Sequence, residues 1–223
     1  MKNLFAIVGL VALGIPCAYA TVEVRIINTA GGGDTGWVQC AGTSCSFLGA
    51  VGNYNIALNL AIQSNSTNPL LDMTYNANTL IANAGTIEFE AIADGYTLNI
   101  PGTQLVANGN STLGDTVGVA AFGGNNNTIC AAGVNGCSAS SNGTLLEAGS
   151  GLTENLNFTK SGGGNTVSPY ELGLLLLLVN PVNAGNASGD IQLNAVPEPA
   201  SVALLGGVLL VAVTAIRRKT RRA

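Results

Sequence analysis

Residues 54–63 read YNIALNLAIQ, and this run decides the fold class. Large apolar residues occupy every second position from Tyr54 to Ile62. The positions between them are Asn or Ala, and Gln63 follows the last one. A period of two places the large apolar side chains on one face of an extended strand and the small or polar ones on the other. The run therefore predicts a strand that is buried on one face only.

Shorter runs of the same kind recur along the chain. Further strand candidates lie at 22–26, 70–75, 87–90, 97–100, 117–119, 152–158 and 191–193. Turn signals stand between them at Gly31–Gly33, Asp94–Gly95, Pro101–Gly102, Asn108–Gly109, Asn142–Gly143 and Gly162–Gly164. The 25 Asn and 30 Gly residues disfavour long helices. We therefore expect an all-β fold, an antiparallel β-sandwich of about 8 to 10 strands.

One run is apolar without alternation, from Leu172 to Val179. Its eight residues are too few to span a membrane and too uniform for a strand with one solvated face. The run predicts a central strand covered on both sides. Because Leu is a weaker strand former than Val or Ile, a short buried helix is the alternative.

The C-terminal segment has three parts in a fixed order, AVPEPASVALLGGVLLVAVTAIRRKTRRA from residue 195 onward. Pro197 and Pro199 restrict φ and lack an N–H, so Glu198 is held in extended backbone. Val202–Ile216 then carries no charge, and as a helix it would be roughly 22 Å long, shorter than the roughly 30 Å hydrocarbon core of a bilayer. We expect a single short transmembrane helix.

A basic tail follows the apolar span. It consists of Arg217, Arg218, Lys219, Arg221 and Arg222. Positive charges beside a span favour the cytoplasmic side of a membrane, so this end is expected to be the cytoplasmic anchor. The alternative interpretations of span and tail together are an ordinary tail anchor and a buried helix with a solvated basic end.

The box Val196, Pro197, Glu198, Pro199, Ala200 and Ser201, the Gly-bearing span and the Arg-rich end together resemble the PEP-CTERM sorting signal of Gram-negative bacteria. The resemblance implies recognition and processing near Glu198 by a membrane-embedded exosortase, in cells that make extracellular polysaccharide. The same motif is also described as an ice-binding protein C-terminal domain. That description concerns the tail and assigns no activity to the rest of the chain.

The N-terminus has the pattern of a secretory signal peptide. Lys2 precedes an apolar stretch from Leu4 to Ile15, and Ala18 and Ala20 form an Ala-x-Ala cleavage site. We expect the Sec translocon and signal peptidase to process this end after Ala20, and a first transmembrane anchor is the alternative interpretation. The expected domains are a signal peptide (1–20), an extracytoplasmic body (21–195) and a sorting segment (196–223). The chain would sit transiently in the inner membrane and then reach the cell surface or extracellular matrix.

The expected body is strongly acidic. It holds two basic residues, Arg25 and Lys160, against 11 acidic ones, for a net charge of −9. A surface with so few cations argues against nucleic acid as a partner, because phosphate contacts need Lys and Arg.

Four cysteines remain in the body, Cys40, Cys45, Cys130 and Cys137. An even number in an oxidising compartment predicts two disulfides. Three pairings exist, and the short spacings favour Cys40 with Cys45 and Cys130 with Cys137. Zinc is disfavoured because the chain has no His and the spacings differ from those of zinc sites.

Candidate chemistry in the body is sparse. Without His, relays of the Ser-His-Asp or Cys-His kind cannot be built. Glu88 and Glu90 lie two residues apart, about 7 Å on one strand face, which would suit a glycoside hydrolase, although such acids are usually a solvated face. Bound calcium is a further alternative, at Asp34, Asp94 or Asp115 in turn-like contexts. We expect no catalytic residue, metal or cofactor.

Three functional hypotheses follow. The first is a structural protein without catalysis, processed by exosortase and held at the surface or in exopolysaccharide or biofilm matrix. The second is a surface module that binds polysaccharide or ice. The third is a glycoside hydrolase that uses two carboxylates.

Overall fold

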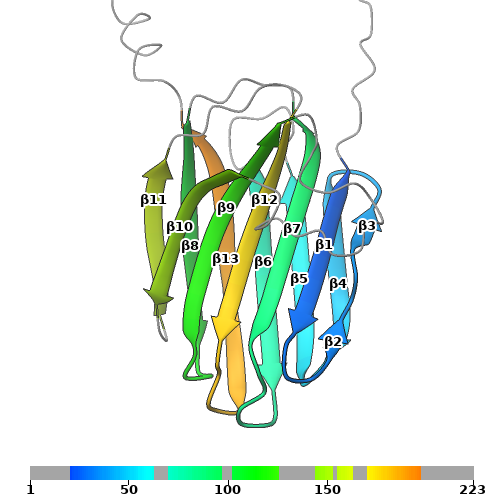
Figure 1. The fold of residues 1–223 in the computed structure, drawn as a ribbon, viewed down its shortest axis with the longest axis vertical. Helices are drawn as coiled ribbons and strands as arrows, with labels where there is room; N and C mark the ends of the chain where they lie inside the picture. The colour runs from blue at the N-terminus through cyan, green and yellow to red at the C-terminus, as the bar shows by residue number, and fades with distance from the viewer. Residues whose placement is uncertain are drawn as a thin grey trace, which may run out of the picture.

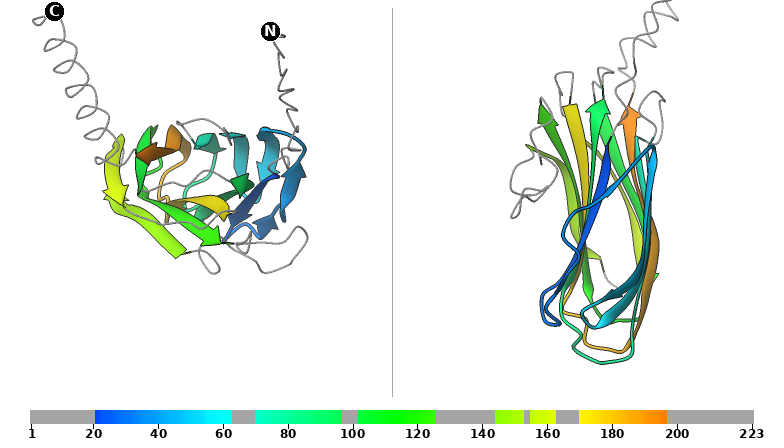
Figure 2. Two further views of the ribbon diagram at one scale, coloured as in Figure 1. Left: turned by 90° about the horizontal axis from the view of Figure 1, so that it is seen from above. Right: turned by 90° about the vertical axis from the view of Figure 1, so that its right-hand side faces the viewer.

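A computed structural model describes residues 21–62, 70–96, 102–125, 144–152, 155–162 and 170–196 (Figure 1). These residues form thirteen strands in two antiparallel sheets that lie face to face (Figure 2). The sequence-based expectation of an antiparallel β-sandwich is confirmed. The described part of the chain holds more strands than the 8 to 10 expected from the sequence.

The first sheet has seven strands in the order β10-β9-β12-β7-β1-β2, with β3 also pairing with β1. Its strands are β1 (Val22–Asn28), β2 (Gly33–Asp34), β3 (Val38–Cys40), β7 (Ile87–Tyr96), β9 (Thr116–Asn125), β10 (Thr144–Leu152) and β12 (Tyr170–Val179). The second sheet has six strands in the order β11-β8-β13-β6-β5-β4. Its strands are β4 (Ser44–Val51), β5 (Tyr54–Ile62), β6 (Leu71–Thr79), β8 (Gly102–Ser111), β11 (Asn155–Gly162) and β13 (Gly185–Val196).

Strand β5 behaves as its alternation predicts. Its five large apolar side chains, from Tyr54 to Ile62, are at most 4% exposed, and the residues between them are exposed or half-buried. The ring of Tyr54 is buried, and its hydroxyl donates a hydrogen bond of 2.8 Å to the carbonyl oxygen of Gly85. The strand is thus buried on one face only.

Strand β12 lies inside the seven-stranded sheet, paired with β7 on one side and β9 on the other. Leu172, Leu174, Leu176 and Leu178 face the opposite sheet and are fully buried. Leu175 points to the outer side and is also buried, in a second apolar cluster with Ile92, Ala120 and Phe122. The prediction of a central strand covered on both faces is confirmed, and the alternative of a short helix is wrong.

Two of the expected turns lie inside strands. Asn108–Gly109 is part of β8, where Gly109 pairs with Gly189 of β13. A Cβ on Gly109 would lie 2.6 Å from the carbonyl oxygen of Ser188, and a Cβ on Gly189 would lie 2.9 Å from the ring of Tyr75. The two glycines therefore leave room for the Tyr75 ring in the core.

Asp94–Gly95 is the second such case. It belongs to β7, where two residues face one residue of β12 and the register shifts. Gly95 has φ 79°. The positive φ and the extra residue form a β-bulge, so the glycine bends the strand without ending it.

The range 152–158 was expected to be one strand and forms parts of two. Strand β10 ends at Leu152 and pairs with β9, whereas β11 begins at Asn155 and pairs with β8 in the other sheet. The chain thus changes sheets here. The range 97–100 lies outside the described residues.

We predict that Gly189→Ala lowers the free energy of unfolding by about 1–3 kcal/mol, because the new methyl group meets the carbonyl oxygen of Asn108 at 2.4 Å. Ser188→Ala, one residue earlier on the outer face, is the control and should change it by less than about 0.5 kcal/mol. Chemical denaturation measures both. Equal effects of the two substitutions would contradict the tight glycine contact.

Candidate functional site

The outer face of the six-stranded sheet is rich in side-chain amides. We call it the amide face, and among the described residues its amides include Asn55, Asn59, Asn76, Asn78, Gln104, Asn108, Asn110, Asn157, Asn186, Gln192 and Asn194. Each follows from alternation, since the neighbouring residues of its strand point into the core. The sheet register sets them side by side, for example Asn55 opposite Asn78 and Asn78 opposite Asn186.

A groove crosses this face over strand β5. It consists of two adjoining hollows of about 370 Å³ and 220 Å³ that share Ala57 and Asn76 in their linings. The larger hollow also contacts Leu48, Ala50, Asn55 and Asn78, and the smaller one Asn59 and Thr74. The side chain of Ala57 is shorter than the Asn side chains around it. This difference in side-chain length forms the groove.

Two aspartates lie next to each other on the amide face. Asp72 of β6 is paired in register with Gln192 of β13, whose side chain donates a hydrogen bond of 2.9 Å to Asp190. Burial raises the pKa of Asp72 to about 7, and the neighbouring Asp190 carboxyl adds to this shift. Neither aspartate lines the groove.

Glu88 and Glu90 share the outer face of the seven-stranded sheet, as the sequence predicted, but this face is not a solvated one. Glu90 is fully buried and stands opposite Arg25 in register, with 3.8 Å between its Oε2 and Arg25 Nη1. Burial raises the pKa of Glu88, and the Glu90 charge raises it further. A pair with one carboxylate enclosed beside a guanidinium does not provide the open, substrate-facing acids of a glycosidase.

Arg25 also contacts Asp34. Its Nε and Nη2 donate hydrogen bonds of 3.0 Å and 2.6 Å to the two carboxylate oxygens of Asp34. These bonds hold the pKa of Asp34 below its usual range. The register between β1 and β7 brings Arg25 to Glu90, a contact that the sequence alone did not reveal.

The other two calcium candidates bind protein groups. Asp94 accepts a hydrogen bond from the backbone N–H of Thr21, and Asp115 accepts one of 2.5 Å from the hydroxyl of Ser111. Across the described ranges, no group of three or more acidic or Cys side chains gathers at metal-binding distance. The three aspartates expected from turn contexts are not brought together.

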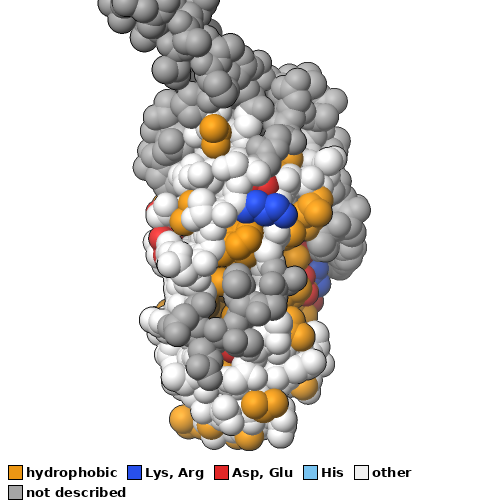
Figure 3. Space-filling model, turned by 90° about the vertical axis from the view of Figure 1, so that its left-hand side faces the viewer, with side chains coloured by type: hydrophobic (Ala, Val, Ile, Leu, Met, Phe, Trp, Pro, Cys, Tyr) orange, Lys and Arg blue, Asp and Glu red, His pale blue; other side chains and the backbone are white. Residues whose placement is uncertain are grey.

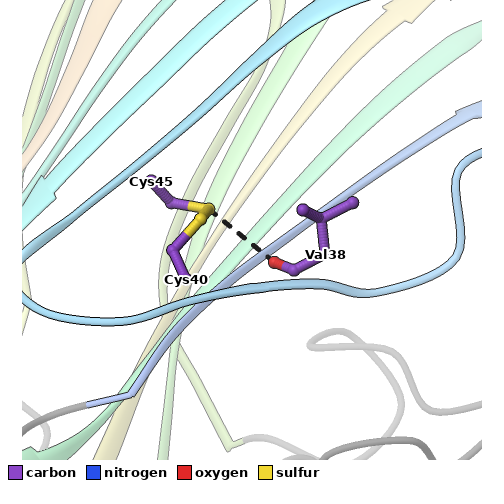
Figure 4. The surroundings of a disulfide bond; sticks show 3 residues. All are labelled: Val38, Cys40 and Cys45. Atoms are coloured by element: carbon purple, nitrogen blue, oxygen red, sulfur yellow. Dashed lines mark hydrogen bonds between the residues drawn. A yellow bond between two sulfur atoms is a disulfide. The ribbon is translucent and has the colours of Figure 1, made fainter.

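One predicted disulfide is present. Cys40 of β3 is bonded to Cys45 of β4, and Cys45 Sγ lies 3.7 Å from the carbonyl oxygen of Val38 (Figure 4). Because β3 belongs to the seven-stranded sheet and β4 to the six-stranded sheet, the bond joins the two layers at one edge. Cys130 and Cys137 lie outside the described residues.

The sorting box begins where the last strand ends. Val196 is the final residue of β13, and β1 begins and β13 ends at the same end of the sandwich (Figure 1). Pro197 to Ser201, the basic residues from Arg217 to Arg222, and Ala18 and Ala20 lie outside the described residues. Among the residues that are described, no helix has the length and apolar character to cross a membrane.

The chain carries a PEP-CTERM protein-sorting motif, since the family model of that description matches residues 195–219. No curated protein matches the chain. Among solved structures, the tailspike protein 4 enzymatically active domain of bacteriophage CBA120 is similar at 8% identity and TM-score 0.35, covering 69% of this chain and 19% of that one.

Two further solved structures are similar at comparable levels. A cleaved adhesin domain of Lys-gingipain from Porphyromonas gingivalis has 9% identity and TM-score 0.33, covering 70% of this chain and 100% of that one. A xylan-binding domain from Paenibacillus barcinonensis has 8% identity and TM-score 0.31, covering 69% and 92%. All these TM-scores are below 0.5.

We predict that Arg25→Met lowers the free energy of unfolding by about 3 kcal/mol, because it removes the cation beside the buried Glu90 carboxylate. Asp34→Asn removes only a partly exposed carboxylate beside Arg25, so it should lower the free energy of unfolding by less than about 1 kcal/mol. Denaturant titration of both variants checks this difference. Two equal losses would show that the Arg25–Glu90 contact has no special importance.

Stability should also depend on pH through Asp72. Its pKa is about 7 when folded against an ordinary value of 3.8, so the folded state binds the proton more tightly. Stability from this group is therefore complete below about pH 4 and is lost as pH rises toward about 7. We predict that Asp72→Asn raises the thermal midpoint at pH 8 more than at pH 4. A Tm difference from wild type that is the same at both pH values would contradict the raised pKa.

Proposed function

We propose that this chain, which carries a PEP-CTERM sorting motif, is an exported surface protein that is processed by an exosortase and held in extracellular polysaccharide as a component without catalysis. The observation that carries the proposal is the position of the motif. Its match begins at residue 195, and the last core strand ends at Val196. Cleavage in the box would thus release the sandwich with every strand intact.

Features of the body support a location outside the cytoplasm. The Cys40–Cys45 disulfide fits an oxidising compartment. On the side of the molecule formed by β10 and β11, few of the described side chains in view are charged (Figure 3). In the proposed arrangement, residues 1–20 are the signal peptide, 21–195 the body, and 196–223 the segment that holds the precursor in the inner membrane of a Gram-negative cell.

The acids of the body support a structural role over catalysis. Glu147 of β10 accepts hydrogen bonds from the hydroxyl of Thr103 and from the backbone N–H of Leu105, both on β8, so it connects the two sheets. Glu90, Asp94 and Asp115 likewise contact protein groups. The chain has no His to act as a general base near neutral pH.

A second candidate function is ligand binding at the cell surface. The amide face favours it, because it joins many hydrogen-bonding side chains to a groove. Polysaccharide suits this face better than ice does. The described residues of the groove lining include several Asn and Ala but a single Thr, Thr74, whereas an ice-binding face would present a regular ladder of Thr.

We predict that Glu198→Ala blocks processing, because it removes the only charge of the proline-held box. An epitope placed after Ala223 should be absent from the mature wild-type protein and retained in the variant, which should stay with the inner membrane. Asn194→Ala, upstream of the box, is the control and should be processed normally. Immunoblots of membrane and surface fractions measure the outcome.

A mature wild-type protein that keeps residues 202–223 would contradict the proposal. Normal trimming of the wild-type chain in cells that lack exosortase would contradict it as well.

A further inference from the structure

We propose that the groove over β5 on the amide face is a binding site for a neutral polysaccharide. The inference deepens the proposed function and rests on it for the exposure of this body to extracellular polysaccharide. The ligand class follows from three properties of the groove: its hydrogen-bonding groups, its apolar floor and its charge.

The hydrogen-bonding groups match sugar hydroxyls. An Asn side chain offers one acceptor oxygen and two N–H donors, and a hydroxyl group both donates and accepts. Within the described part of the chain, the side chains of Asn55, Asn59 and Asn78 form no hydrogen bond to another residue. The side-chain N–H of Asn186 donates a hydrogen bond of 3.1 Å to the side-chain oxygen Oδ1 of Asn76, which orients the Asn76 amide and leaves its N–H groups for a ligand.

The apolar residues of the groove match the C–H surfaces of a sugar ring. Leu48 is 86% exposed and lines the larger hollow together with Ala50 and Ala57. A sugar placed here would cover the Leu48 side chain while its hydroxyl groups reach the flanking amides. Burial of this exposed apolar surface would favour binding.

The dimensions favour a chain of sugars over a single one. The two hollows follow β5 from Asn55 to Asn59, and these four residue-to-residue steps span about 14 Å in an extended strand. Both hollows are open to the surface, so a long polymer could enter and leave at either end. The end of the groove nearest the sorting box is at Thr74, which pairs with Asp190, six residues or about 20 Å from Val196 along β13.

The charge of the groove favours a neutral polymer. No Lys or Arg is among the described residues that line either hollow, and an acidic pair, Asp72 and Asp190, lies on the same face. The body carries a net charge of −9. A uronic acid polymer would thus be repelled and would find no cation in the groove.

Affinity electrophoresis of the purified full chain in detergent tests the proposal. The probes are four neutral polysaccharides (β-glucan, galactan, mannan and xylan) and polygalacturonate as the acidic counterpart. At least one neutral polymer should retard the chain, and polygalacturonate should not. Ala57→Trp fills the groove and should weaken binding at least tenfold, and Asn55→Ala with Asn76→Ala should do the same. Asn110→Trp, on the same face outside the groove, should bind as wild type does.

Several outcomes would overturn the proposal. These are no retardation by any neutral polymer, equal retardation by polygalacturonate, or wild-type binding by both groove variants with unchanged thermal midpoints. Thermal hysteresis without polysaccharide binding would assign the face to ice. A dimer that Ala57→Trp dissociates would assign it to a second copy. Binding is measured on purified protein and processing is measured in cells. Absence of polysaccharide binding therefore does not affect the processing result, and absence of processing does not affect the binding result.

Discussion

The contact between the inner faces of the two sheets is the constraint on which the rest of the structure depends. Each strand of the six-stranded sheet gives alternate residues to this contact, and the leucines of β12 meet them from the other side. The rings of Tyr75 and Phe89 come together across it, with centroids 5.7 Å apart. Tyr96 completes the contact by donating a hydrogen bond of 2.7 Å to the carbonyl oxygen of Leu70. Since the inner faces are committed to the core, any ligand must use an outer face or an end.

The two outer faces differ in chemistry. That of the seven-stranded sheet carries a second buried apolar cluster around Leu175 and Phe122, together with Glu90 beside Arg25. That of the six-stranded sheet carries amides and hydroxyls with one shallow groove. This asymmetry directs the proposed polysaccharide contact to the six-stranded sheet and leaves the opposite sheet a structural role. The disulfide between Cys40 and Cys45 holds both layers together at one edge.

Local patterns in the sequence predict strands with regularly placed large apolar residues. Other strands and the contacts between side chains depend on how strands pair, which local patterns do not show. The alternation of β5, the uniform run of β12 and the short cysteine spacing each act within a few residues. Strand β8 does not stand out in the sequence because Asn108–Gly109 has the composition of a turn. The reason for Gly109 lies in another strand, since a Cβ there would lie 2.6 Å from the backbone carbonyl oxygen of Ser188 in β13. Arg25 reaches Glu90 only through the register of β1 with β7.

The amide face has a signal in the sequence, whereas the groove within it does not. Asn recurs with a period of two at 76 and 78 and again at 108 and 110, which is the spacing of one strand face. The Asn and Gly content disfavours long helices, and Asn108–Gly109 has the composition of a turn, so composition alone does not indicate this face. The groove itself needs Leu48, Ala57 and Asn76 to meet, and only the order β4-β5-β6 brings them together.

The most direct measurement of the central claim is the NMR response of the Asn side-chain amides to a neutral polysaccharide. The account predicts that the resonances of Asn55, Asn59, Asn76 and Asn78 shift together on titration while those of Asn108 and Asn110 stay in place. Shifts confined to Trp37 and the outer face of the seven-stranded sheet, or no shift of any side-chain amide at saturating polymer, would contradict it.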